Sequence, residues 1–219
     1  YLQPIGLGEQ YCELGAYNYL QTTINHFSTP PLDGIRTSFN NLSIAAVNGL
    51  TMVAALDPFW TDSPACNNGE SPLSCEYRLV RPSVAVIMLG RMDVTYFDVD
   101  FYRETATDVI EESIASGVIP VLTTFVVLPD NEAWEASLAF NATLVELANA
   151  YDVPLINLWR AVQTLPQFGI GPDLTHLKHE VGQFCAFTGA ETRLGGTLRN
   201  LLTLQALDSI RRSTLMDGR

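Results

Sequence analysis

The sequence predicts an α/β fold, a three-layer α/β/α sandwich with a mostly parallel sheet. Short runs of almost uninterrupted apolar residues, typical of strands covered on both faces, alternate with longer segments of helical periodicity. Such alternation of strands and helices favours a parallel sheet with helices on both of its faces. Because 219 residues suit one sizeable core, we expect a single domain over residues 1–219.

The first part of the chain carries helix, strand and loop signals. Residues 13–27 place apolar side chains at three- and four-residue spacing, which predicts an amphipathic helix. Residues 43–47 are expected to form a short strand that ends at the turn Asn48-Gly49, and residues 50–56 a short helix. Residues 57–81 contain three prolines and are expected to be loop.

The second part of the chain alternates regularly. Strands are expected at 83–90, 118–125 and 153–159, and helices at 101–116, 130–150 and 194–212. Asp130 is the expected N-cap of the second of these helices. In parallel sheets the reactive groups gather beyond the C-terminal ends of the strands, so the residues that follow each strand are the first candidates for a site.

The composition excludes several classes of function. A net charge of −12 repels phosphate backbones and anionic lipid surfaces, so neither nucleic acid nor a membrane surface is an expected partner. The longest apolar runs have strand length, which is too short to span a bilayer. Trp60, Trp134 and Trp159 either pack in the structure or stack on sugars.

Four cysteines allow three disulfide pairings, of which we favour Cys66–Cys75 with Cys12–Cys185. Cys66 and Cys75 bracket a segment of turn residues that a disulfide would hold in place. The even number of cysteines, the acidity and the single lysine indicate a secreted or cell-surface protein. The alternative is a cytosolic protein with buried free thiols.

Few residues suggest modification or metal binding. The sequons at Asn41 and Asn141 permit glycosylation. No C-x-x-C motif occurs, so we expect no metal site, and a loop cluster of His176, His179 and Glu180 is the weaker alternative. We also expect no cofactor, because no glycine-rich loop for phosphates follows a strand.

The clearest chemical motif is Asp173-Leu174-Thr175-His176, after the last expected strand. An aspartate three residues before a histidine orients the imidazole through one ring nitrogen and leaves the other nitrogen to act as a general base. An ordinary loop pair is the competing interpretation of this spacing.

With this motif, the chain resembles the SGNH (GDSL-type) hydrolases over about residues 13–208. The family has a flavodoxin-like sheet, and the resemblance implies that Asp173 and His176 are its catalytic orienter and base. Gly49 matches the glycine whose backbone amide donates to the oxyanion, and residues 90–93 lie where the family has Gly-x-Asn-Asp. Residues 75–83 look like a subgroup of secreted bacterial members with the same disulfide loop.

The departures from the family pattern bear on activity. No Gly-Asp-Ser nucleophile block is present, and Gly6-Leu7-Gly8 is the only local candidate. Since residue 1 is Tyr, we expect a processed or trimmed chain whose nucleophile block lay upstream. Met92 stands where the family has an asparagine donor. A thioether cannot donate, and losing one oxyanion donor costs about 10²- to 10³-fold in rate.

The missing block also removes a strand that is central in a sheet of order 2-1-3-4-5. We expect the gap to be filled by a retained upstream peptide, by Tyr1–Gly8, or by a strand from another copy of the chain. The last option makes a homo-oligomer the expected partner.

Three functions remain open. The first is a catalytically degenerate SGNH-like protein that acts outside the cell as a structural, assembly or binding component. The second is an active serine esterase whose nucleophile lies on an upstream segment, with His176 as base and Asp173 as orienter. The third is an unrelated flavodoxin-like binding module. A carbohydrate or an acyl ester is the expected ligand.

Overall fold

The computed structural model describes residues 12–29 and 37–217. The chain divides into two compact units, one of residues 42–159 and one of residues 1–41 with 160–219. The prediction of a single domain over residues 1–219 stays a prediction.

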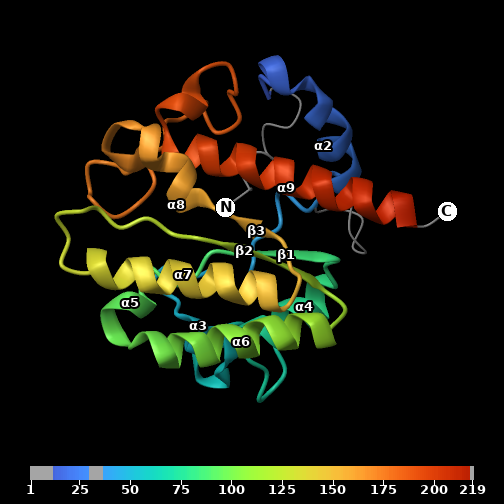
Figure 1. The fold of residues 1–219 in the computed structure, drawn as a ribbon. Helices are drawn as coiled ribbons and strands as arrows, with labels where there is room; N and C mark the ends of the chain where they lie inside the picture. Colours follow the sequence, from blue (N-terminus) through green and yellow to red (C-terminus); the bar gives the residue numbers. More distant parts are fainter. Residues whose placement is uncertain (1–11, 30–36, 218–219) are drawn as a thin grey trace. The chain divides into compact units, whose positions relative to one another are not determined.

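The unit of residues 42–159 is built on a parallel sheet (Figure 1). Its strands are β1 (Val84–Ile87), β2 (Ile119–Thr123) and β3 (Leu155–Ile156), in the order β1-β2-β3. Val84 pairs with Ile119, and Leu122 pairs with Leu155. The predicted α/β class with a parallel sheet flanked by helices is confirmed, and all three strands lie inside the apolar runs that predicted them.

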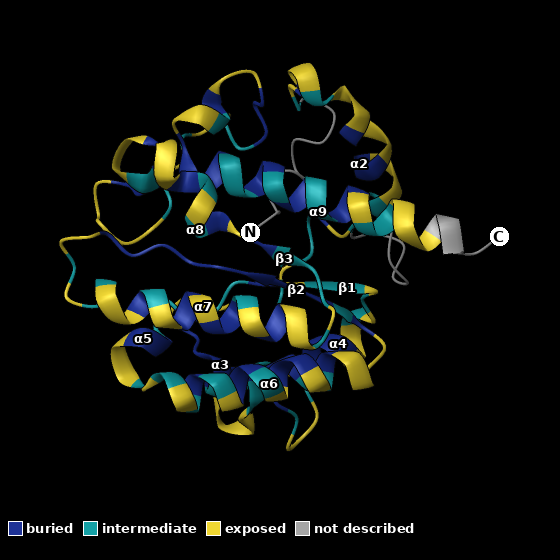
Figure 2. Cartoon of the chain, viewed as in Figure 1, coloured by how far each residue is buried: buried dark blue, intermediate teal, exposed yellow. Residues whose placement is uncertain are grey.

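Helices of the same unit cover this sheet. They are α3 (Met52–Leu56), α4 (Pro72–Val80), α5 (Asp93–Tyr96), α6 (Val99–Ala115) and α7 (Trp134–Ala150). Helices α6 and α7 pack against each other and against β2. Their buried faces meet in the core, where the rings of Tyr102 and Phe140 stack with centroids 4.5 Å apart. Figure 2 shows this division into a buried and an exposed face along both helices.

The other unit pairs two segments from opposite ends of the chain. A 3₁₀ turn (Gly15–Leu20) leads into α2 (Gln21–Phe27), which packs on the long helix α9 (Gly195–Asp217). At this contact the buried hydroxyl of Thr23 donates to Asp208 Oδ1 at 2.6 Å. The expected helix at 13–27 is confirmed as helical, with its first half wound as 3₁₀.

Two element predictions are wrong. Residues 43–47 form turns instead of a strand, because Ala46 N–H bonds back to Ser43 O and Ile44 N–H donates to the carboxylate of Glu76. Residues 57–81 are not all loop, since α4 lies within them. Ser71 caps α4 by accepting from Ser74 N–H, and Pro72 at the first helical position supports the start.

The start of α7 also differs from the prediction. Asp130 is not its N-cap, because the helix begins at Trp134 and Ala133 holds the cap position without a side-chain bond. Strand β3 is shorter than the predicted strand at 153–159. The helix α8 (Leu158–Ala161) begins within that predicted range.

Strand β1 lies at one edge of the three-stranded sheet. Its continuous apolar run predicted a covered strand, yet Val86 is 40% exposed. The expectation that Tyr1–Gly8 fills this edge falls outside the described residues, and pairing with another copy stays a prediction. No helix among the described residues combines the length and apolar character that crossing a bilayer requires.

Candidate functional site

Asp173 and His176 form a hydrogen-bonded pair in the unit that contains α9. Asp173 Oδ2 lies 2.8 Å from His176 Nδ1, while Asp173 Oδ1 accepts from the backbone N–H groups of Thr175 and His176, both at 3.0 Å. These backbone donors, His176 N–H foremost, and the bond to the imidazole lower the pKa of Asp173 to about 2. The carboxylate therefore stays ionised at neutral pH.

The loop around the pair is a tight turn. Gly171 N–H donates to His176 O at 2.8 Å, and Ile170 bridges Leu177 in antiparallel fashion. Leu174 sits between the two site residues with φ of 60°. His176 is 68% exposed, and no described residue lies at hydrogen-bond distance from its Nε2. The pair can therefore take a proton from a group that reaches this nitrogen from solvent.

The two residues assigned to the oxyanion belong to the unit of residues 42–159. Gly49 has φ of 83°, and nothing lies within 4 Å of where a Cβ would stand. Met92 is half-buried at the start of α5. The segments that carry Gly49 and Met92 are joined, because Met52 N–H donates to Asp93 Oδ1 at 2.8 Å.

Asp93 is a residue to which the sequence assigned no separate role. It is fully buried, and its burial raises the pKa of the carboxyl against the lowering effect of the backbone N–H groups of Met52, Asp93 and Gly90. The signal was present in the sequence as one acid directly after a strongly apolar strand. A buried carboxyl at the C-terminal end of a parallel strand is a frequent feature of functional sites.

Gly90 brings the end of β1 close to the end of β2. It has φ of 124°, and a Cβ at this position would overlap the ring of Phe125 and lie 2.7 Å from the Tyr102 hydroxyl. That hydroxyl donates to Leu89 O at 3.1 Å. Residue 90 must therefore be glycine for residues 90–93 to lie against the end of the neighbouring strand.

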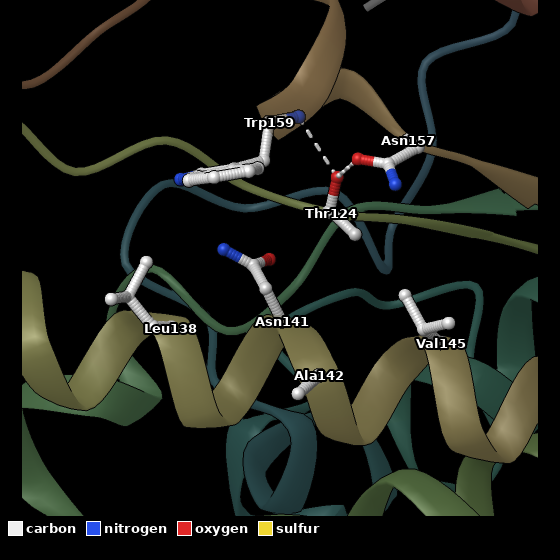
Figure 3. A pocket seen from close by; sticks show the side chains of 7 residues that line it. All are labelled: Thr124, Leu138, Asn141, Ala142, Val145, Asn157 and Trp159. Carbon is white, nitrogen blue, oxygen red and sulfur yellow. Dashed lines mark hydrogen bonds between the residues drawn. The ribbon is translucent and has the colours of Figure 1, made fainter.

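A cavity of about 290 Å³ lies at the C-terminal ends of β2 and β3 (Figure 3). Its lining residues are Thr124, Leu138, Asn141, Ala142, Val145, Asn157 and Trp159. Thr124 Oγ1 accepts from the backbone N–H of Trp159 at 2.9 Å and donates to Asn157 Oδ1 at 3.4 Å. The Trp159 ring is tilted against that of Trp134, with centroids 6.4 Å apart, and whether either ring also stacks on a sugar stays a prediction. Sequence periodicity had no means of locating this cavity.

Both predicted disulfides, Cys12–Cys185 and Cys66–Cys75, are present. Two disulfides fit an oxidising environment. Within the described part of the chain, the one group of His, Cys, Asp or Glu side chains close enough to hold a metal is Cys66, Glu70 and Cys75. Its two sulfurs are already bonded to each other, and Glu70 pairs with Arg78, so the group is structural.

The two sequons differ in environment. The Asn141 side chain is buried, and its amide both accepts from Phe125 N–H and donates to Phe125 O, each at 2.9 Å. A glycan on its nitrogen would disturb the second of these bonds, and glycosylation at Asn141 stays a prediction. Asn41 is half-buried, and glycosylation there stays a prediction.

Comparison with known proteins finds structural similarity at low sequence identity. No family model and no curated protein matches the chain. A GDSL-like lipase from Bacteroides thetaiotaomicron is 17% identical over 62% of this chain and 66% of its own, with a TM-score of 0.44. A psychrotrophic esterase from Pseudoalteromonas is 14% identical over 64% of this chain and 69% of its own, with a TM-score of 0.47. At these values no residue role is carried over from either protein.

Proposed function

We propose that Asp173 and His176 act as the base of a site that hydrolyses an acyl ester. The observation that carries this proposal is the 2.8 Å hydrogen bond between Asp173 Oδ2 and His176 Nδ1 in a loop that leaves Nε2 exposed. The carboxylate fixes the tautomer in which Nδ1 carries the proton, so Nε2 has a lone pair available.

The chemistry follows from this arrangement. His176 Nε2 takes a proton from a water molecule or from a hydroxyl group outside the described residues. At the same time, the oxygen of that water or hydroxyl bonds to the ester carbonyl carbon. The carbon–oxygen bond to the alcohol then breaks, and the imidazolium returns the proton to the departing alcohol. Where a hydroxyl group attacked, the acyl group stays on its oxygen until a water molecule, deprotonated by His176 in the same way, releases the acid. Asp173 stays ionised throughout, because its pKa is about 2, and stabilises the imidazolium charge.

A second function, a degenerate member of the same fold that works as an extracellular structural or binding component, is favoured by Met92. The resemblance implies a hydrogen-bond donor at position 92, and the thioether of Met92 cannot donate a hydrogen bond. The two disulfides support a place outside the cytoplasm for either function.

The test is hydrolysis of a short acyl ester by the purified chain and two histidine variants. His176→Ala should reduce turnover by about 10²-fold or more, which is the usual contribution of a positioned base. His179→Ala is the matched control, since this exposed histidine lies three residues away and stacks on Phe184 instead of pairing with a carboxylate. Equal turnover by the parent chain and His176→Ala would reject the proposal.

Treatment with a fluorophosphonate probe, followed by intact mass measurement, identifies the nucleophile. A covalent adduct indicates a serine hydroxyl, whereas turnover without an adduct indicates water. Absence of both turnover and adduct in the parent chain would favour the extracellular binding component.

A further inference from the structure

The cavity at the C-terminal ends of β2 and β3 has a lining that is uncharged throughout (Figure 3). Helix α7 supplies one wall, through Leu138, Ala142 and Val145. The ring of Trp159 faces α7 across the cavity. All of the lining residues belong to the unit of residues 42–159. The cavity is therefore a feature of one compact unit, and its apolar walls favour a ligand without charge.

The polar side chains of the lining bond to protein partners. The Asn141 amide exchanges two hydrogen bonds with the backbone of Phe125, each 2.9 Å long. The Thr124 hydroxyl accepts from Trp159 N–H and donates to Asn157 Oδ1. A well-held water molecule needs about two to four polar partners, and groups that are already bonded offer it few. An apolar group that displaces weakly held water from such a cavity gains affinity.

The size and shape of the cavity suit a short chain. Its volume is about 290 Å³, whereas a dry apolar cavity of about 150 Å³ already takes up benzene. Leu138 and Val145 lie two turns apart on α7, which is about 10 Å along the helix axis. Ala142 and Asn157 are exposed, so the cavity opens to solvent beside them. This shape favours an unbranched apolar chain whose polar end stays in water.

We propose that this cavity binds the alkyl chain of a small, neutral aliphatic alcohol. The chain lies along α7, between Leu138 and Trp159, and the ligand hydroxyl stays on the open side beside Asn157. Burial of the chain drives binding, since each methylene group removed from water contributes a similar free energy. Cavities at the C-terminal ends of strands are the usual ligand sites of α/β sheets.

This site is independent of the ester hydrolysis proposed for Asp173 and His176, because neither residue lines the cavity and the readout is binding. The full chain is titrated with the unbranched alcohols from 1-butanol to 1-octanol. Tryptophan emission reports binding, since it moves to shorter wavelength when an alkyl chain displaces water from the Trp159 ring. Glucose has the same number of carbon atoms as 1-hexanol and is the polar comparison.

The affinity of the parent chain should follow the length of the alcohol. We expect binding to tighten about fourfold with each added methylene group until the cavity is full. Glucose should bind more weakly than 1-hexanol. An affinity that does not rise from 1-butanol to 1-hexanol overturns the proposal, and so does tighter binding of glucose than of 1-hexanol.

Three variants locate the site on α7. Ala142→Phe places a ring in the cavity and should abolish the rise in affinity with chain length. Ala139→Phe is the matched control and should bind like the parent chain, because Ala139 is also exposed on α7 but lies outside the lining. Leu138→Ala enlarges the cavity, so the rise in affinity should continue to a longer alcohol than in the parent chain. An unchanged series in Ala142→Phe or in Leu138→Ala, or loss of binding in both phenylalanine variants, overturns the proposal.

Discussion

The carboxylate of Asp93 accepts a hydrogen bond from the backbone N–H of Met52 at 2.8 Å, across 41 residues of sequence. This bond ties the segment after β1 to the first turn of α3. It also brings together the two segments that carry Gly49 and Met92, the residues that the sequence resemblance assigns to an oxyanion site. The stability of this junction is therefore testable separately from any activity.

Replacing Asp93 should separate the need for an acceptor from the need for a charge. Asp93→Ala leaves the buried Met52 N–H without a partner and should lower the free energy of unfolding by about 1–3 kcal/mol. Asp93→Asn keeps an acceptor oxygen and should cost less. Denaturant titration of both variants measures the difference, and an equal loss in both would contradict this account.

The raised pKa of Asp93 can be checked by measuring how the free energy of unfolding of the parent chain and of Asp93→Asn depends on pH. Because burial raises this pKa, ionisation costs more in the folded than in the unfolded chain. The stability of the parent chain relative to Asp93→Asn should therefore fall as pH rises above the unfolded value of about 4. A relative stability that rises over this range would mean that the folded pKa is lowered.

Gly90 should tolerate no side chain. Gly90→Ala combines a positive φ with overlap on Phe125 and should destabilise the fold by about 2–4 kcal/mol. Gly117→Ala is the matched control, since Gly117 also has a positive φ, 72°, but nothing lies within 4 Å of its Cβ position. The control should cost about 1 kcal/mol. Similar losses in thermal or chemical denaturation would show that the close approach is unimportant.

Asp173→Asn should slow ester hydrolysis by about 10²-fold or more, because an amide does not hold the imidazole in the required tautomer. Asp130→Asn, which changes an exposed acid in the other unit, should leave turnover unchanged. Asp173 contributes stability above its unfolded pKa of about 4 that is lost as pH falls toward 2. Its protonation should not limit turnover above about pH 4, and a loss of activity that follows titration of Asp173 near neutral pH would exclude this mechanism.

Met92→Asn distinguishes the two candidate functions. If the chain hydrolyses esters with a weakened oxyanion site, a restored donor should raise turnover by up to about 10²- to 10³-fold. If the site is degenerate for want of a nucleophile, this single change should restore nothing. Turnover of a short acyl ester by Met92→Asn and the parent chain decides between them, with Met92→Leu as the control that fills the same volume without a donor.

The two disulfides should contribute unequally to stability. Cys12–Cys185 joins residues 173 apart, whereas Cys66–Cys75 spans 9. Loop-closure entropy then predicts a loss of about 5 kcal/mol for the double serine variant of the first and about 3 kcal/mol for that of the second. Comparing the denaturation midpoints of the two double variants tests this order, and a larger loss from the Cys66–Cys75 variant would reverse it.

The sequence alone was sufficient wherever the pattern is local. The apolar runs at 83–90 and 118–125 predicted the positions of β1 and β2, because short apolar runs between helical segments are typical of strands in parallel sheets, although β1 lies at an edge and is not covered on both faces. The spacing of Asp173 and His176 predicted their contact, since three residues in a tight turn leave little freedom. The disulfide Cys66–Cys75 followed for the same reason from the turn residues that it encloses.

Only the tertiary structure decided how distant segments compete for hydrogen bonds and space. Residues 43–47 became a turn because the Glu76 carboxylate, 32 residues away, binds Ile44 N–H. The burial of Asp93 and the contact of Gly90 with Phe125 likewise depend on neighbours that no sequence window contains. All three have the same physical reason. The free energy of a buried polar group or of a glycine at a close contact depends on its neighbours in space, and those neighbours are distant in the sequence.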